Sequence, residues 1–202
     1  VVDHVACQFP ASAPRPILIG HSFGGLVVQK LLGQGRATAA IAIDPAPIRG
    51  VWQLPLSALK ASFPALGNPL NYRKAVALTE PQFRYAFANA VSDVEARELF
   101  GRCAIPAPAR PLFQAATATF NPWAATAVDT RNASRGPLLV TAGSADHTVP
   151  PVLSRSTVHR YQHSPAITEF KEFAGRGHSL TIDSGWTEVA DHCLAWLRAR
   201  VP

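Results

Sequence analysis

A serine between two glycines, in the stretch LIGHSFGGLV, constrains the fold more than any other feature of the sequence. Residues 16–19 before it form a short apolar run typical of buried strands, and residues 26–32 after it can continue as a buried helix. A strand, a sharp turn and a helix around Gly-x-Ser-x-Gly are typical of a nucleophile elbow. We therefore expect Ser22 at a tight turn, with Gly20 and Gly24 as the small residues that let strand and helix approach closely.

A nucleophilic serine requires a base to remove its proton and a carboxylate to orient that base. Asp146 lies in GSADHTVP, after an apolar run, and His178 lies in GRGHS, after the next predicted strand. Because the carboxyl ends of parallel strands share one edge of a sheet, we expect Ser22, Asp146 and His178 to meet there. Asp44 follows another apolar run, at residues 39–43, and is the alternative acid.

Three stretches of the chain differ in their periodicity. Residues 1–49 and 129–202 alternate strand and helix patterns, whereas residues 50–128 have a helical pattern. Within the middle stretch, Thr79 and Ser92 each precede a glutamine or glutamate three residues later, which predicts two capped helix starts. The sequence therefore predicts an α/β core with a parallel sheet and a helical insertion.

Composition and charge disfavour several classes of function. The chain has 202 residues, 48% of them hydrophobic and 16% charged, which is ordinary for a globular domain. Its net charge of +6 is spread along the chain without a basic block, so no nucleic-acid partner is expected. No apolar run is long enough to span a membrane, and no signal-peptide pattern begins the sequence. We therefore predict a cytoplasmic location.

Cysteines and histidines show no pattern typical of a metal site. The three cysteines are far apart in the sequence, so neither a disulfide framework nor a zinc site is expected. No cluster of histidine, cysteine and acidic residues has metal-ligand spacing. We expect no metal.

Because its serine, aspartate and histidine motifs follow one another in that order along the chain, the sequence resembles the α/β-hydrolase superfamily. The GHSFGG, GSADHTVP and GRGHS stretches match the superfamily's nucleophile, acid and histidine loops, and the resemblance covers essentially the whole chain. It implies a mainly parallel sheet flanked by helices, with residues 50–128 as a helical cap. It also implies Ser22 as nucleophile, His178 as base and Asp146 as acid. The backbone N–H of Phe23 would be one oxyanion donor, and no cofactor is implied.

Candidate substrate-binding residues come from the elbow and from the insertion. His21, next to the nucleophile, is expected to be structural or to belong to the pocket wall. Aromatic side chains of the insertion are candidates for an apolar wall: Phe113, Phe120 and Trp123. Packing within the insertion would account for these three residues equally well.

His147 is expected to point away from the site if Asp146 points into it.

The N-terminal part of the superfamily's pattern is missing from this sequence. Its members carry their first strands and a second oxyanion loop several dozen residues before the elbow, whereas only residues 1–21 precede Ser22 here. The chain also contains no methionine, which is typical of a fragment or a processed segment. We expect the strand before Ser22 to have one neighbour and a bare edge. The chain alone is therefore expected to associate and to be nearly inactive.

The serine narrows the expected reaction to acyl transfer. Superfamily members that open epoxides or remove halogens carry an aspartate at the elbow, which disfavours both reactions. Hydrolysis of a small carboxylic ester through an acyl-enzyme is the leading prediction. Amide, thioester and carbon–carbon bond hydrolysis and perhydrolysis are alternatives with the same three residues. A non-catalytic member that binds a small apolar ligand is the alternative of a different class.

Overall fold

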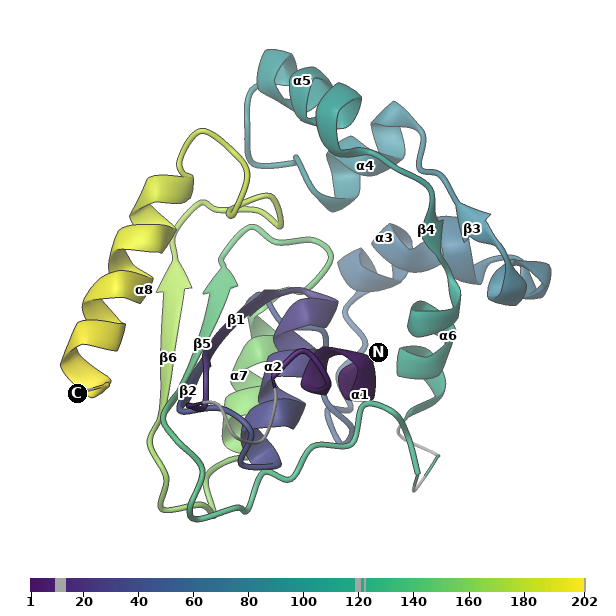
Figure 1. Ribbon diagram of the computed structural model, residues 1–202. Coiled ribbons are helices and arrows are strands. Elements are labelled where there is room, and N and C mark those ends of the chain that lie inside the picture. Colours follow the sequence, from purple (N-terminus) through teal and green to yellow (C-terminus); the bar gives the residue numbers. More distant parts are fainter. Residues whose placement is uncertain (10–13, 119–120, 122, 202) are drawn as a thin grey trace.

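A parallel sheet organises the part of the chain that the structure describes (Figure 1). The structure is a computed structural model and describes residues 1–9, 14–118, 121 and 123–201. Within these ranges, four parallel strands form the main sheet: β1 (Ile17–His21), β2 (Ala39–Ile43), β5 (Leu138–Gly143) and β6 (Thr168–Phe173). The strands lie in the order β1-β2-β5-β6. The predicted α/β fold with a mainly parallel sheet is confirmed.

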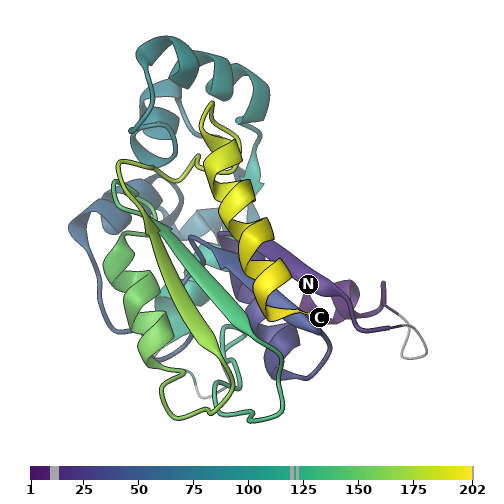
Figure 2. The same ribbon diagram turned by 90° about the vertical axis from the view of Figure 1, so that its left-hand side faces the viewer.

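Helices cover both faces of this sheet (Figures 1 and 2). They are α2 (Phe23–Gly33) and α7 (Pro151–His159) on one face and α8 (Trp186–Arg200) on the other. Alternate residues of β2 divide between the two cores, because successive side chains of a strand point to opposite faces. Ala40 and Ala42 pack with α2 and α7, whereas Ile41 and Ile43 pack with α8. Burial on both faces explains the continuous apolar run of β2.

The strand before Ser22 lies at one edge of the described sheet. Among the described strands, β1 pairs with β2 alone, as predicted, and its residues Ile17 and Ile19 are 43% and 56% exposed. Beside this edge, Ile19, Ile43 and apolar side chains of α8 line a groove of about 240 Å³. An apolar strand edge of this kind favours pairing with another chain. The association and the loss of activity predicted for the chain alone stay predictions.

The described part of residues 50–128 forms a mostly helical segment between β2 and β5. Its elements are α3 (Leu56–Leu66), the 3-10 helix η1 (Pro69–Arg73), β3 (Ala75–Val76), α4 (Glu80–Ala86), α5 (Asp93–Cys103), β4 (Ala107–Pro108) and α6 (Arg110–Thr117). Both predicted helix caps are present: the Thr79 N–H donates to Gln82 Oε1 at 2.9 Å, and Ser92 Oγ accepts from the Glu95 N–H at 3.2 Å. Figure 1 shows α4 and α5 beyond the carboxyl ends of the strands, where the predicted site lies.

The first helix, α1 (Val2–Ala6), packs against α2, and its Ala6 joins the core on that face of the sheet. All three cysteines are free: Cys193 is buried, Cys103 half-buried and Cys7 exposed. Within the described ranges, no helix combines the length and the apolar character needed to cross a membrane.

Candidate active site

Ser22 occupies a strained turn between β1 and α2. Its backbone has φ +55° and ψ −119°, a conformation that costs a residue with a side chain about 1–3 kcal/mol. The Ser22 N–H donates to the Ile43 carbonyl at 3.0 Å, and the Ser22 carbonyl accepts from the Ala46 N–H at 2.9 Å. These hydrogen bonds to the end of β2 and the loop after it hold the strained turn. The geometry is that of a nucleophile elbow.

Close approach of α2 to β1 explains the glycines around Ser22. A Cβ on Gly20 would lie 2.2 Å from the Gly24 carbonyl oxygen, so no side chain fits there. A Cβ on Gly24 would meet no atom within 4 Å, whereas one on Gly25 would lie 2.8 Å from the Pro45 Cβ. The close approach predicted at Gly20 is confirmed. On the helix side, the crowded position is Gly25 and not Gly24.

Alanine substitutions at the two motif glycines are expected to have opposite effects on stability. Gly20→Ala forces β1 and α2 apart and should lower the free energy of unfolding by about 3 kcal/mol or more. Gly24→Ala adds a methyl group in open space and restricts the unfolded chain, so it should raise that free energy by about 0.5 kcal/mol. Urea unfolding measures both changes. Equal stability of the two variants would contradict the packing described here.

The predicted acid and base meet in the interior at the carboxyl ends of β5 and β6. His178 Nδ1 lies 2.6 Å from Asp146 Oδ2, and both side chains are fully buried. The other oxygen of Asp146 accepts from the backbone N–H groups of Thr148 at 2.7 Å and Val149 at 2.8 Å. Burial alone would raise the pKa of Asp146, but the charge and the hydrogen bond of His178, together with the hydrogen bond from the Val149 N–H, lower it. Asp146 is therefore an ionised partner that orients the His178 ring.

The loop that carries His178 is braced by a buried carboxylate, Asp183. This side chain accepts from Ser179 Oγ at 2.9 Å and forms an ion pair with the Arg176 guanidinium. Its second oxygen also accepts from the Gly185 N–H at 3.1 Å. The residues on both sides of His178 are thus tied to one buried charge, which fixes the ring relative to Asp146.

Asp44, the alternative acid, is buried in the same region but is not the hydrogen-bond partner of His178. Its two carboxyl oxygens lie 3.1 and 3.2 Å from the Gly143 N–H, which donates to them. Asp146 is the carboxyl within hydrogen-bond distance of the His178 ring. The geometry therefore favours Asp146 over Asp44 as the partner of the predicted base, His178.

His21 packs against the ring of His178. The ring centroids lie 4.5 Å apart with the planes tilted by 44°, and His21 Nε2 is buried without a hydrogen-bond partner among the described residues. Burial, followed by the nearby charge of His178, lowers the pKa of His21 to about 3. His21 is therefore neutral near pH 7. Its place beside the predicted base fits a pocket-wall role, which stays a prediction.

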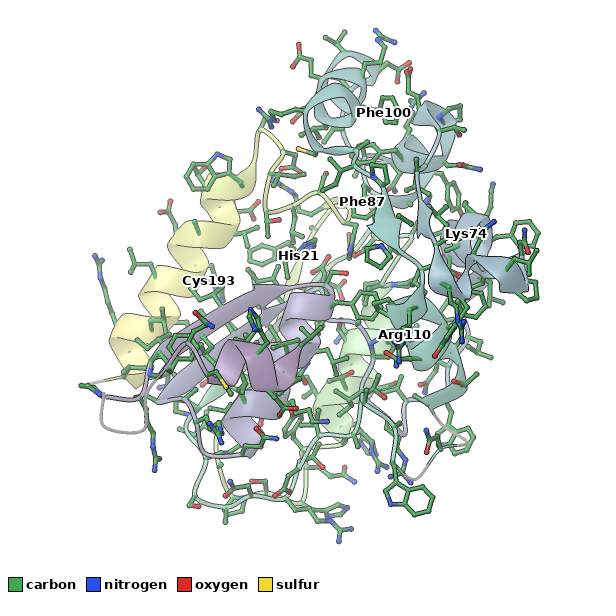
Figure 3. The ribbon with its side chains drawn as sticks, turned by 45° about the vertical axis from the view of Figure 1, so that its right-hand side comes forward. His21, Lys74, Phe87, Phe100, Arg110 and Cys193 are labelled. Atoms are coloured by element: carbon green, nitrogen blue, oxygen red, sulfur yellow. The ribbon has the colours of Figure 1, made fainter. Side chains whose placement is uncertain are left out.

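The end of α4 covers the acid and histidine loops. The Phe87 ring lies 5.0 Å from the His178 ring, and its carbonyl accepts from the Ser179 N–H at 3.0 Å. Asn89 Nδ2 donates to the Ala145 carbonyl at 2.7 Å. In Figure 3, Phe87 and His21 lie near each other between the sheet and the helical segment. Sequence reasoning missed Phe87 and Asn89, because they follow a helix without any motif that marks them.

The acid loop makes two further contacts with the end of α4. His147 Nδ1 lies 3.0 Å from the Tyr85 carbonyl, and the rings of these two residues lie 4.5 Å apart. Thr148 Oγ1 donates to the Ala86 carbonyl at 2.6 Å. His147 thus contacts the end of α4, whereas Asp146 contacts His178; that His147 points away from the site stays a prediction.

Ser22 and His178 are not hydrogen-bonded to each other among the described contacts. His178 Nε2 is buried and has no hydrogen-bond partner among the residues that the structure describes, which leaves it free to accept a proton. Hydrogen bonds between catalytic residues are often long without substrate and tighten when it binds. Phe23 is the first residue of α2, and the first N–H groups of a helix have no partner within the helix. The Phe23 N–H is therefore available as a donor, and its oxyanion role stays a prediction.

The aromatic candidates for a substrate wall lie apart from these contacts. Phe113 is half-buried and packs edge-on against Tyr72, with ring centroids 5.8 Å apart. Trp123 is 87% exposed. Phe120 lies outside the described residues. None of the ring contacts described for this part of the chain joins Phe113 or Trp123 to His178, and their substrate-binding role stays a prediction.

Asp44, Asp146 and His178 also form a group of potential metal ligands that spacing in the sequence does not reveal. His178 Nδ1 and Asp146 Oδ2 are 2.6 Å apart, however. Two ligands of one tetrahedral zinc ion lie about 3.3 Å apart, because each is about 2.0–2.1 Å from the metal. The short contact is therefore a hydrogen bond and not a pair of ligands to one ion.

Comparison with known families agrees with this geometry. A model of the alpha/beta hydrolase family matches residues 1–192. The chain belongs to this family. The resemblance inferred from the three motifs is therefore confirmed. Among curated proteins, none matches this α/β-hydrolase at a significant level.

Solved structures of other α/β-hydrolases share the fold. They include an extracellular α/β-hydrolase from a Paenibacillus species (22% identity, TM-score 0.62), the monoacylglycerol lipase of Paleococcus ferrophilus (19%, 0.59) and a meta-cleavage product hydrolase from Pseudomonas fluorescens (17%, 0.61). The Paenibacillus alignment covers 100% of this chain and 77% of that structure. The lipase alignment covers 98% of this chain and 73% of the lipase. The alignment with the meta-cleavage product hydrolase covers 100% of this chain and 71% of that structure. At such identities the likeness shows the fold alone.

Proposed function

We propose that this α/β-hydrolase is a serine hydrolase that cleaves a small carboxylic ester through an acyl-enzyme, with Ser22, His178 and Asp146 as its triad. The buried hydrogen bond of 2.6 Å between His178 and Asp146 carries this proposal. It lies at the same edge of the sheet as the strained turn of Ser22. A nucleophile, a base and an orienting carboxylate at one sheet edge are the groups that acyl transfer requires.

The reaction follows from the roles of these groups. Ser22 Oγ attacks the substrate carbonyl while His178 Nε2 takes its proton, and Asp146 stabilises the imidazolium that forms. The Phe23 N–H donates to the developing oxyanion, as a residue after the nucleophile does in this fold. His178 then gives the proton to the leaving alcohol. Water enters, loses a proton to His178 and releases the acid, which regenerates Ser22.

In this proposal, residues 50–128 are the cap and residues 1–49 and 129–202 are the hydrolase core. The end of α4 supports this division, because its backbone and side chains bond to the acid and histidine loops. Phe87 packs edge-on against the fully buried His178, and in this proposal it helps to keep water away from the base. The substrate would then enter between the cap and the sheet edge, beside His21.

A serine at the elbow acts through an acyl-enzyme, which limits the substrate to an acyl compound, and an ester is the class that we favour. Several solved structures of the same fold are described as esterases, including a thermophilic esterase and a carboxylesterase from Bacillus subtilis. The partner is thus a small acyl compound, with no cofactor or nucleic acid. A cytoplasmic location remains part of the proposal, although the Paenibacillus neighbour is extracellular.

Covalent labelling tests the proposal. A fluorophosphonate should modify Ser22 of the protein that carries these 202 residues, and mass spectrometry of the peptides should locate the adduct. Ser22→Ala should abolish labelling, whereas Ser134→Ala, at an exposed serine, should not change it. An adduct on another serine, with ester turnover intact, would contradict the proposal. Ligand binding without any adduct would indicate a non-catalytic member instead.

A further inference from the structure

Two carboxyl groups share one buried site beside His178. Asp44 follows β2 and Asp146 follows β5, and these strands are neighbours in the sheet. One ligand atom from each of Asp44, Asp146 and His178 lies within 4.8 Å of the other two, and all three residues are buried. Among the ion pairs between described residues, none joins a lysine or arginine to either carboxyl. Two adjacent buried carboxylates without such a partner cannot both stay ionised.

The hydrogen-bond donors around the two carboxyls show which one is charged. Asp146 accepts from three groups: the N–H of Thr148, the N–H of Val149 and His178 Nδ1. Asp44 accepts from the Gly143 N–H, which lies at 3.1 and 3.2 Å from its two oxygens. Donors stabilise the ionised form of a carboxyl group. The negative charge therefore belongs on Asp146, and Asp44 is the neutral member of the pair.

We infer that Asp44 is a positioning residue that keeps its proton and donates it in a hydrogen bond to Asp146. This inference rests on the proposed function, because it assigns Asp44 a role through Asp146 and His178. The bond adds a fourth donor to Asp146 and leaves one negative charge beside His178. Asp146 then stays an acceptor, so Nδ1 of His178 holds a proton and Nε2 is free to act as the base.

Titration behaviour and backbone geometry agree with this role. Burial raises the pKa of Asp44 well above its usual value, and a hydrogen bond to Asp146 and the charge of Asp146 raise it further. The Asp44 backbone has φ +41°, a strained conformation that aspartate and asparagine tolerate better than most residues. Among described residues other than glycine, only Ser22 and Asp44 have positive φ. The chain therefore holds Asp44 in place at a cost in strain, as it does the elbow serine.

The pH dependence of stability distinguishes the two carboxyls. Unfolded Asp44 ionises at about pH 3.9 whereas the folded residue keeps its proton, so its contribution to stability falls as the pH rises above that value. The pKa of Asp146 is lowered by folding, so its contribution is present above about pH 3.9 and is lost as the pH falls. The other titratable groups at the site are His178 and His21, and His21 is neutral throughout this range.

Thermal unfolding between pH 4 and pH 7 tests the inference. The Tm of Asp44→Asn, relative to that of the unsubstituted protein, should increase as the pH rises, because asparagine has no proton to lose on unfolding. The Tm of Asp146→Asn, relative to the same reference, should show no such increase, because the contribution of Asp146 is already present above about pH 3.9. A relative Tm of Asp44→Asn that falls with rising pH would overturn the inference, because it would show an ionised Asp44.

Activity provides a second measurement through rescue by the conservative variant. Asp44→Ala removes the donor to Asp146 and should lower kcat about tenfold or more, with a smaller effect on KM. Asp44→Asn should keep most of the kcat that Asp44→Ala loses, because the asparagine amide can accept from the Gly143 N–H and donate to Asp146. Equal losses for both variants would overturn the inference. If Ser22→Ala keeps full turnover, the proposed function fails instead, while the Tm comparison still tests Asp44.

Carbon-13 NMR of the unsubstituted protein avoids dependence on how the variants fold. With aspartate labelled at its carboxyl carbon, Asp44 should keep the chemical shift of a protonated acid from pH 4 to pH 7, while Asp146 keeps that of a carboxylate. An Asp44 signal with the shift of a carboxylate at pH 7 would overturn the inference.

Discussion

Replacing Ser22 with alanine in the protein that carries these 202 residues is expected to lower ester turnover about 10⁶-fold, and so is replacing His178. The physical reason is that nucleophile and base act as a unit: an unactivated serine hydroxyl is a weak nucleophile, and the base without the serine has no alcohol to activate. A factor of 10⁶ corresponds to about 8 kcal/mol of transition-state stabilisation. Turnover of a simple carboxylic ester by purified protein measures it.

The double variant provides the sharpest control for this result. Because the two residues act as one unit, the double variant Ser22→Ala with His178→Ala should turn over the ester no more slowly than either single variant does. Additive losses would show that the two side chains act in separate steps. A loss of only a few-fold in either single variant would mean that other residues carry the reaction.

Asp146→Asn is expected to lower turnover about 10⁴-fold while the protein stays folded. The amide would turn a donor toward His178 Nδ1, which now faces an acceptor at 2.6 Å, and would favour the imidazole tautomer with its proton on Nε2. A base with a proton already on Nε2 cannot accept one from Ser22. Turnover of the same ester, together with circular dichroism to confirm folding, measures the effect.

Asp191→Asn, at an exposed position on α8, is the matched control and should leave turnover unchanged. Normal turnover in Asp146→Asn would remove Asp146 from the triad and would make Asp44 the acid. This outcome is distinct from failure of the whole proposal, which would also leave Ser22→Ala active.

Local sequence patterns were sufficient to predict most of the architecture. Short apolar runs and the spacing of helix caps are properties of short stretches, so the strands and the helix starts after Thr79 and Ser92 appear as predicted. Parallel strands place their carboxyl ends at one edge of a sheet. Ser22 and the loops of Asp146 and His178 could therefore be assigned to a common edge from the sequence alone.

Contacts between distant segments could not be predicted in this way. The sequence offered two carboxyls for His178, and only the paths of the loops after β2 and β5 decide that Asp146 reaches the ring. Gly24 looked like the crowded helix position, but the distance to Pro45 makes Gly25 that residue. The aromatic residue that packs against His178 is Phe87 and not one of the predicted wall residues.

The sequence by itself determined the α/β fold, the elbow around Ser22 and the three loops that carry the candidate triad, because periodicity and turn chemistry are set by neighbouring residues. The tertiary structure alone decided which carboxyl orients His178, that Asp44 is buried beside it, and that the end of α4 covers both loops. A hydrogen bond forms or is lost when the distance between donor and acceptor changes by tenths of an ångström. The pKa of a buried group depends on every segment packed around it. Those distances and that burial exist only in the folded chain.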